Sequence, residues 1–437
     1  MNQARGVPET DDTGDAEASP QELLAGSPRI LSLCCLYPNP AYPAQGVFVQ
    51  RRLQHLARLT PVRVVAPLGI VQYGRPPGKR LCPSRRICGA ERWDGEIPVL
   101  HPRWFYPPFS GSFLGFWLFL QLLQPLRRLR RDFPFEILDA HFGYPEGIAG
   151  CLLARAFGLP FTMTLRGNEP KHSRGALERQ WMGWALRRAS RVFAVSERLR
   201  QFAIGLGAVP ENVKTIPNGV DAGVFWQHDR ESCRRKYGFP PDGRLILSAG
   251  ALVERKGHHR AIRALAAISA GGAPVELAVA GSPGPEGQYE KELRQLVSSL
   301  GLEDRVHFLG AIPADALAEV MSAADLLCLA SSNEGWPNVV HEALACGTPV
   351  VATDVGAIPE MLGGGRFGII VPVNSQAKLE QALRAALERD WDRAAIAEWG
   401  QKRSWNHVAA EVFEQMREIV AREHRPDTAA ARALSGR

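Results

Sequence analysis

The sequence predicts an α/β protein built from two doubly wound, Rossmann-like domains that face each other across a cleft. The chain has 437 residues, which exceeds the size at which a single hydrophobic core keeps growing. Short apolar runs alternate with helical patterns in both halves, as in parallel sheets covered by helices on both faces. Pro and Gly interrupt this alternation at residues 216–226, which predicts the boundary between the two domains.

Each half of the chain supplies its own strands and helices. In the first half, apolar runs of strand length lie at 30–35, 62–66, 136–140, 161–165, 192–195 and 213–216, with helical patterns such as 49–59 and 148–157 between them. The second half repeats the scheme, with strands at 245–249, 275–280, 306–309, 326–329 and 350–352 and helices such as 290–300. We expect one domain at 28–220 and a second domain at 221–423. The amphipathic helix around 405–420 is a candidate to lean back on the first domain.

The two ends of the chain and its cysteines bear on location. Residues 1–27 and 424–437 are predicted to be tails, the first disordered because residues 1–26 carry six acids and one Arg around no continuous apolar core. That segment lacks the pattern of a secretory signal. The eight cysteines include no CxxC pair, and Cys82 and Cys88 are too sparse for a zinc site. We therefore expect a reduced, cytoplasmic protein.

The formal charge of +7 is unevenly distributed along the chain. Residues 27–220 hold 27 Lys/Arg and 11 Asp/Glu, a net charge of +16, whereas residues 221–437 carry a net charge of −4. The basic half either faces an anionic surface or substrate, or is a solvated Arg-rich surface. These basic residues lack interleaved exposed aromatics or a reader motif, so nucleic acid is not an expected partner.

The longest apolar run, "FLGFWLFLQLL" at 113–123, has eleven residues, too few for a helix that spans a bilayer, which needs about 20. Arginines follow it at Arg127, Arg128, Arg130 and Arg131. Two interpretations stay open for this segment. It is either an interfacial anchor with a basic flank, which would hold the protein at the inner face of the cell membrane, or a buried helix of the first domain.

The stretch "SSNEGWPNVVHEALACGTPVV" at 331–351 holds two carboxylates eight positions apart, Glu334 and Glu342. Pro337 in the first turn and Gly347 past the end are typical of a helix over 337–346. The amides of Asn338 and Val339 are then free at the positive end of the helix dipole, which favours an anion. Acids beside an anion site are expected where the ligand carries hydroxyls as well as phosphate, as a nucleotide sugar does.

Other polar loops follow the predicted strands and should meet at the carboxyl ends of the sheets. Arg255 and Lys256 precede Gly257 at a strand-to-helix junction, where cations suit a diphosphate. A glycine-rich loop after a strand, at 280–290, contains Gly281 and would permit close approach of a ligand, and Gly46 lies before a helix in the loop that follows the first strand. The loop "DAHFGYPEG" presents His141 and Glu146, and "TLRGNEP" presents Arg166, Asn168 and Glu169.

Taken together, these segments resemble the family-4 retaining glycosyltransferases with the GT-B fold, over roughly residues 29–420. The resemblance rests on "GVFV", "AHFGYPEG", "LRGNE", "IPNGVD", "ERKG" and "EGWPNVVHEA", and bacterial enzymes of surface-polysaccharide assembly share such forms. It implies that Lys256 and Arg255 neutralise the donor diphosphate and that Glu342 holds ribose hydroxyls. It also implies that Glu334, next to Gly335, holds the transferred sugar, while the amides of Asn338 and Val339 cap a phosphate.

The chain departs from the family pattern at two positions. Relatives often carry "GRLVPEKG", whereas Ala251 stands here in place of the first Arg. Arg166 stands where many relatives have a catalytic-site His, and His141 lies in the adjacent loop. The expected activity is a metal-independent transfer of a hexose from a UDP- or GDP-sugar donor to a glycan or lipid-linked acceptor, and the resemblance implies that the transfer is retaining. We expect residues 28–220 to form the acceptor-binding domain and residues 221–423 the nucleotide-sugar-binding domain. No metal or other cofactor is expected, because the one DxD string, "DWD" at 390–392, lies in a helical pattern that we interpret as a solvated helix face.

Two alternatives remain open. The chain could be another GT-B enzyme, such as a sugar-nucleotide epimerase or a phosphorylase, or a non-catalytic scaffold that binds nucleotide or glycan. The residues name neither the base, the sugar, the acceptor nor the linkage.

Overall fold

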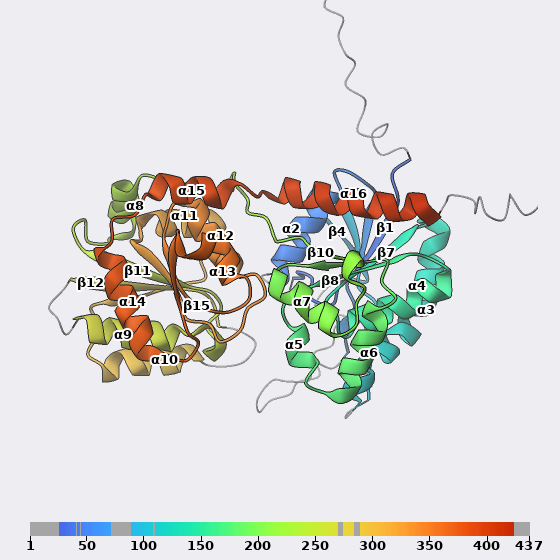
Figure 1. Cartoon of the computed structure of the whole chain (residues 1–437), viewed down its shortest axis with the longest axis horizontal. Coiled ribbons are helices and arrows are strands. Elements are labelled where there is room, and N and C mark those ends of the chain that lie inside the picture. The colour runs from blue at the N-terminus through green and yellow to red at the C-terminus, as the bar shows by residue number, and fades with distance from the viewer. Residues whose placement is uncertain are drawn as a thin grey trace, which may run out of the picture.

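The computed structural model describes residues 26–40, 42–43, 45–70, 89–107, 110–269, 274–283 and 289–423. The tail expected at 424–437, nearly all of that expected at 1–27, and Cys82 and Cys88 lie outside the described residues. Two α/β domains lie side by side (Figure 1). This confirms the predicted fold class of two Rossmann-like domains.

The first domain is built on an eight-stranded sheet with the order β10-β9-β8-β7-β1-β2-β5-β4. Its strands are β1 (Ile30–Leu33), β2 (Val62–Val65), β4 (Glu91–Asp94), β5 (Ile97–Leu100), β7 (Ile137–His141), β8 (Phe161–Leu165), β9 (Arg191–Ala194) and β10 (Val213–Thr215). Neighbouring strands are parallel except β4 and β5, a hairpin that the sequence patterns did not indicate. The strands β3 (Leu68–Gly69) and β6 (Arg103–Trp104) form a separate parallel pair, and along the chain they follow β2 and β5.

Helices cover this sheet on both faces, and most of them bury an apolar side against it. They are α2 (Val47–Leu56), α3 (Leu114–Asp132), α4 (Glu146–Phe157), α5 (Glu169–His172), α6 (Ala176–Leu186) and α7 (Glu197–Gly205). One apolar cluster joins α3, α4 and α6 to one side of the sheet, and α2 belongs to the cluster on the other side.

The second domain has a six-stranded, fully parallel sheet with the order β13-β12-β11-β14-β15-β16. The strands are β11 (Arg244–Ala249), β12 (Val275–Ala280), β13 (Val306–Gly310), β14 (Leu326–Leu329), β15 (Val350–Thr353) and β16 (Gly368–Val371). Their helices are α8 (Arg230–Tyr237), α9 (His258–Ser269), α10 (Tyr289–Ser299), α11 (Ala314–Ala323), α12 (Asn338–Ala345), α13 (Ile358–Met361), α14 (Gln376–Glu388) and α15 (Arg393–Gln401).

Each sheet reverses its strand order at a central strand, at β1 in the first domain and at β11 in the second. In doubly wound sheets, ligands bind outside the carboxyl end of the strands at such a switch point. The order of the strands therefore directs attention to the loops that follow β1, β7, β8, β11 and β14.

The last helix, α16 (Trp405–Glu423), returns to the first domain (Figure 1). Its buried side chains Val408, Val412 and Met416 share a hydrophobic cluster with Val49 of α2. Asn406 adds a polar contact, with its Oδ1 2.6 Å from His55 Nδ1. The chain therefore passes between the domains twice, which restricts how far they can separate.

Helix α3 is a core helix of the first domain. Its side chains Leu118, Leu122 and Leu126 are buried, and the helix packs on α4. The opposite side exposes apolar residues near its start and arginines near its end: Phe113, Leu120, Arg127, Arg128 and Arg131. The segment thus buries one face, as expected of a buried helix of the first domain. Its other face keeps an exposed stripe of apolar and basic side chains.

The prediction that the "DWD" string lies on a helix face was wrong. Residues 390–392 form the connection between α14 and α15 instead of a helix face. Asp392 Oδ1 accepts a hydrogen bond from Ala395 N and caps α15, and Trp391 Nε1 donates to Ala386 O. Capping explains the helical appearance, because an Asp directly before a helix satisfies one of its free amides.

Candidate functional site

The loops after β11 and β14 bring Lys256 and Glu334 together. Lys256 lies in a short 3-10 turn (Glu254–Lys256), and its Nζ is 2.6 Å from Glu334 Oε1. Ser331 Oγ donates to the same carboxylate oxygen at 2.8 Å. The side chains are 14% and 9% exposed, so this ion pair is shielded but open at one side. A ligand between the strand ends would meet an ammonium and a carboxylate that are already held in place.

Helix α12 begins at Asn338, shortly after Glu334 and one residue after the start at 337 that the sequence predicts. Pro337 precedes its first residue, Asn338, so the amides of Asn338 and Val339 have no carbonyl of the same helix to bond. Val340 is fully buried and anchors the helix in the core of the second domain. Trp336 packs against the cores of both domains, which places the start of α12 at the domain interface.

The second acid of the motif, Glu342, lies one turn further along α12 and is partly buried. Burial raises the pKa of its carboxyl to about 7, although Arg51 and Lys256 lower it in part. No hydrogen bond to the carboxylate contributes to this pKa among the described residues. A partly buried acid without a partner costs stability, so the structure gives Glu342 no role in holding the fold.

The Glu342→Gln variant should be more stable than the wild type at pH 8 by about 1–3 kcal/mol and nearly equal to it at pH 4.5. The folded pKa is raised above the ordinary value of 4.5, so stability present below pH 4.5 is lost as the pH rises through about 7. Gln stays neutral and avoids that loss. Urea unfolding at the two pH values measures the difference, and an equal difference at both would show that ionisation of Glu342 is not its cause.

Two of the predicted glycines serve the packing of neighbouring loops. A Cβ on Gly46 would lie 1.7 Å from Leu36 O, and one on Gly281 would lie 1.8 Å from Gly250 O. Gly46 also has φ +72°, in the left-handed region that favours glycine. The structure therefore explains both glycines by contact between chain segments, and their contact with a ligand stays a prediction.

Arg255 lies apart from the buried part of the site. Its side chain is exposed, and its carbonyl accepts a hydrogen bond from Ser332 N at 2.8 Å. The guanidinium has no ion pair within 4.0 Å among the residues that the structure describes. Arg255 is thus free to turn toward a ligand, whereas Ala251, on the same loop, offers no charge.

His141 and Arg166 meet in the first domain, at the ends of β7 and β8. Arg166 Nη2 lies 3.0 Å from His141 Nδ1, and His141 Nε2 lies 3.1 Å from Asp139 Oδ2. Burial lowers the pKa of His141 to about 4, so the ring is neutral with its N–H on the side of Asp139. His141 is 0% exposed and Arg166 is 8% exposed. Both side chains are enclosed. In this conformation their polar contacts are with other protein side chains, which they help to orient.

Two further acids of the first domain organise these loops. Glu169 accepts hydrogen bonds from the amides of Gly143, Arg166 and Gly167 at 2.7–3.2 Å, which fixes the loop after β8. Glu146 accepts a hydrogen bond from Cys35 N, and burial raises its pKa to about 7. Sequence reasoning placed both acids at the strand ends but gave neither this role.

The loops of the two domains touch beside this cluster. Asn218 Nδ2 donates to Asn338 Oδ1 at 2.9 Å, and its Oδ1 accepts from Arg166 Nη1 at 2.8 Å. Gly167 and Gly335 approach so closely that a Cβ on Gly167 would lie 2.5 Å from Gly335 Cα. Sequence reasoning missed Asn218, Gly167 and Asp139, since only their partners in space reveal their importance. We call the joint set Lys256, Glu334, Asn338, Glu342 and Arg166 the interdomain site.

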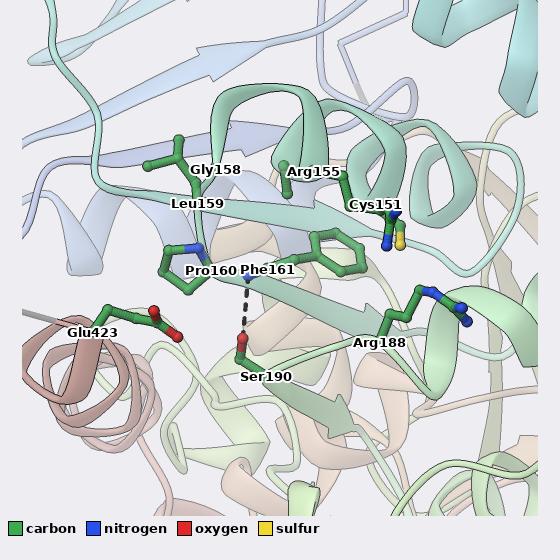
Figure 2. Close-up of a pocket in the computed structure, with 10 residues that line it drawn as sticks. Cys151, Arg155, Gly158, Leu159, Pro160, Phe161, Arg188, Ser190 and Glu423 are labelled. Atoms are coloured by element: carbon green, nitrogen blue, oxygen red, sulfur yellow. Dashed lines mark hydrogen bonds between the residues drawn. The ribbon is translucent and has the colours of Figure 1, made fainter. Parts of the chain in front are cut away.

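A separate cavity of about 250 Å³ lies at the amino end of β8, away from the interdomain site (Figure 2). It is bordered by the end of α4, the turn before β9 and Glu423 at the end of α16. Arg155 and Arg188 at its rim are exposed, and Ser190 Oγ accepts from Phe161 N at 3.4 Å. Within the described part of the chain, no group of three or more His, Cys, Asp or Glu is arranged to hold a metal.

Comparison with known proteins identifies the class. The structure is similar to sucrose-phosphate synthase from Thermosynechococcus elongatus, with a TM-score of 0.73 and 20% identity over 90% of this chain and 99% of that one. It is also similar to the Anabaena protein HepE, solved in complex with UDP, with a TM-score of 0.67 and 21% identity over 90% and 100%. These likenesses, with the two Rossmann-like domains, define the GT-B fold.

Sequence comparison identifies the family. Residues 45–224 match the model of glycosyltransferase family 4, and residues 229–403 match that of the group 1 glycosyl transferases. Bacillus subtilis TuaC, whose name assigns it to teichuronic acid biosynthesis, is 28% identical over 83% of this chain and 90% of its own length. D-inositol 3-phosphate glycosyltransferase from Acidothermus cellulolyticus is 28% identical over 69% and 71%. The chain belongs to these family-4-type glycosyltransferases and is a hexosyltransferase.

Proposed function

We propose that this enzyme transfers a hexose from a nucleoside-diphosphate sugar, with retention and without a metal, to the hydroxyl of a glycan or lipid-linked acceptor. The product would enter polysaccharide or glycoconjugate synthesis. One observation carries the proposal: the Lys256–Glu334 pair, the amides at the start of α12 and Glu342 follow one another at the domain interface, and the carboxylate of Glu342 has no hydrogen-bond partner among the residues that the structure describes. Cations and amides suit a diphosphate, and the two carboxylates suit hydroxyls of the sugar and the ribose.

In this mechanism the leaving diphosphate is stabilised by charge already in place. Lys256 Nζ and the amides of Asn338 and Val339 would face the oxygens on which negative charge develops as the sugar leaves. The exposed Arg255 can add to this charge when a donor is bound. Glu334, held by Lys256 and Ser331, would bind the transferred sugar. The first domain would present the acceptor, and contact between the domains would orient it.

Thermal stabilisation by a panel of UDP- and GDP-sugars tests the donor, because a ligand that binds the folded state raises the unfolding temperature. We expect one base to stabilise the protein, and the same donor to yield a nucleoside diphosphate with a product of the donor's anomeric configuration by proton NMR. An epimerised donor or a free sugar phosphate would favour another GT-B enzyme. Binding without turnover would favour a scaffold.

We further propose that the exposed stripe of α3 rests on the inner face of the cell membrane. Phe113 and Leu120 could enter the headgroup region while Arg127, Arg128 and Arg131 meet anionic lipids. No helix in the described part of the chain is long and apolar enough to cross a membrane. Contact through one helix face is the kind of attachment that this helix allows.

Vesicles that contain phosphatidylserine should sediment the protein at low salt and release it at high salt, because each surface arginine contributes about 1 kcal/mol. The Arg128→Glu variant should bind about tenfold more weakly. The Arg235→Glu variant is the matched control, since Arg235 is an exposed helix residue of the second domain. Equal binding by both variants, or none by the wild type at low salt, would remove this proposal.

A further inference from the structure

A chain of polar side chains runs from the core of the first domain to the start of α12. Asp139 Oδ2 lies 3.1 Å from His141 Nε2, and Arg166 Nη2 lies 3.0 Å from His141 Nδ1. Arg166 Nη1 donates to Asn218 Oδ1 at 2.8 Å, and Asn218 Nδ2 donates to Asn338 Oδ1 at 2.9 Å. The first four side chains are buried, so these contacts are sheltered from competing water.

Asn218 is the link between the domains in this chain. It lies in the segment that leads from β10 to the second domain, and it is 4% exposed. Its carbonyl oxygen faces the guanidinium of Arg166 and its amide group faces the oxygen of Asn338, so both ends of the side chain are used. The cation fixes which way the amide of Asn218 points.

The backbones of two loops, one from each domain, are in contact at the same place. A Cβ on Gly335 would lie 2.0 Å from Arg166 O, so the loop after β8 and the loop before α12 are in direct contact. Glu169 fixes the first of these loops through the amides of Arg166 and Gly167. A side chain that joins both loops at this point therefore controls their relative position.

We propose that Asn218 is a positioning residue of the transfer reaction, an inference that rests on the function proposed above. It holds the start of α12, where the donor phosphate would bind, in register with the Arg166 loop of the first domain. Arg166 is buried, and its guanidinium is joined to the start of α12 through Asn218. Loss of Asn218 lets the two loops move apart without removing any group that touches the substrate.

Kinetics of four variants test this role: Asn218→Ala, Asn338→Ala, the double variant and Asn218→Asp. Each single Ala variant should lower kcat about three- to tenfold, the range for one hydrogen bond, while KM for the donor changes less than twofold. The double variant should be no slower than the slower single one, because both substitutions break the same link. Asn218→Asp should keep near wild-type kcat, since its carboxylate accepts from Arg166 and the amide of Asn338 can turn to donate.

Multiplying effects in the double variant, or an Asn218→Asp variant as slow as Asn218→Ala, would overturn the proposal. Unchanged kcat in both single variants would do the same. Asn338→Ala guards against a folding defect, since Asn338 is partly exposed and its loss leaves the Arg166–Asn218 bond in place.

Hydrogen exchange supplies a second readout that needs no activity. In Asn338→Ala, the amides of Arg166 and Gly167 should exchange faster, although both lie in the other domain. Asn333→Ala, an exposed position in the same loop as Glu334, is the matched control and should leave them unchanged. Equal exchange in the two variants would refute the link. If the wild type transfers no sugar from any donor, the proposed function fails while this exchange result still decides the link.

Discussion

Replacing Lys256 by Ala is expected to lower the rate of sugar transfer by about 100- to 1000-fold, the range for loss of one preorganised group that stabilises developing charge. Lys256 Nζ is 2.6 Å from Glu334 Oε1 and is the partly buried cation of this loop. Its removal takes positive charge from the leaving diphosphate and also frees Glu334 to move. The loss should appear mainly in kcat, because the charge on the leaving group is largest in the transition state.

The control for this prediction is Lys402→Ala. Lys402 is also paired with a glutamate, Glu398, but lies exposed on the surface of the second domain. That variant should transfer sugar at the wild-type rate, since exposed pairs contribute little. A Lys256→Ala variant within threefold of the wild type would show that the site assignment is wrong.

Gly335→Ala is expected to lower kcat about 100-fold, the cost of a displacement of about 1 Å at a reacting centre. The added Cβ would lie 2.0 Å from Arg166 O and 2.9 Å from Gly167 Cα, and both of these atoms belong to the backbone. Backbone cannot move aside as a side chain can, so the loops must separate. The backbone of Gly335 is outside the left-handed region, so steric contact between the domains is the source of the effect.

Gly205→Ala is the control for this effect. A Cβ at Gly205, near the end of α7, would meet nothing within 4 Å. It should leave the rate unchanged, and the unfolding temperature should stay equal or rise slightly, because Ala is favoured over Gly in a helix. Small-angle X-ray scattering with saturating nucleoside diphosphate should give a larger radius of gyration for Gly335→Ala than for Gly205→Ala, and equal radii with equal rates would exclude a closing contact here.

The parallel sheets were predictable because their strands are apolar on both faces and are separated by amphipathic helices. The hairpin of β4 and β5 was missed: Glu91, Arg92 and Asp94 are polar, and the strand lies at the edge of the sheet, where a buried apolar pattern is not needed. The strand β16 was missed as well. It follows three consecutive glycines, Gly363–Gly365, and contains only four residues.

The residues of the site also include some that the sequence indicated and some that it did not. The places of Lys256, Glu334 and the start of α12 follow from local signals, a Gly after a strand and a Pro at a helix start, which the sequence displays. Asn218 and Gly167 lie in two stretches that carry the family resemblance, "IPNGVD" and "LRGNE". Their contacts with Asn338 and Gly335 join residues more than a hundred positions apart, so the sequence did not show what these two residues do. His141 and Arg166 are buried because several elements pack around them. Their positions at strand ends did not show whether their side chains would be buried or exposed.

Calorimetric titration of UDP and of GDP at pH 8 tests the central claim most directly. The claim predicts one binding site for one of these nucleotides in the wild type. It also predicts at least tenfold weaker binding by Glu342→Gln, which loses hydrogen bonds between a carboxylate and the ribose hydroxyls. Failure of both nucleotides to bind, or equal affinity in the wild type and Glu342→Gln, would contradict the assignment of the interdomain site as a nucleotide-sugar site.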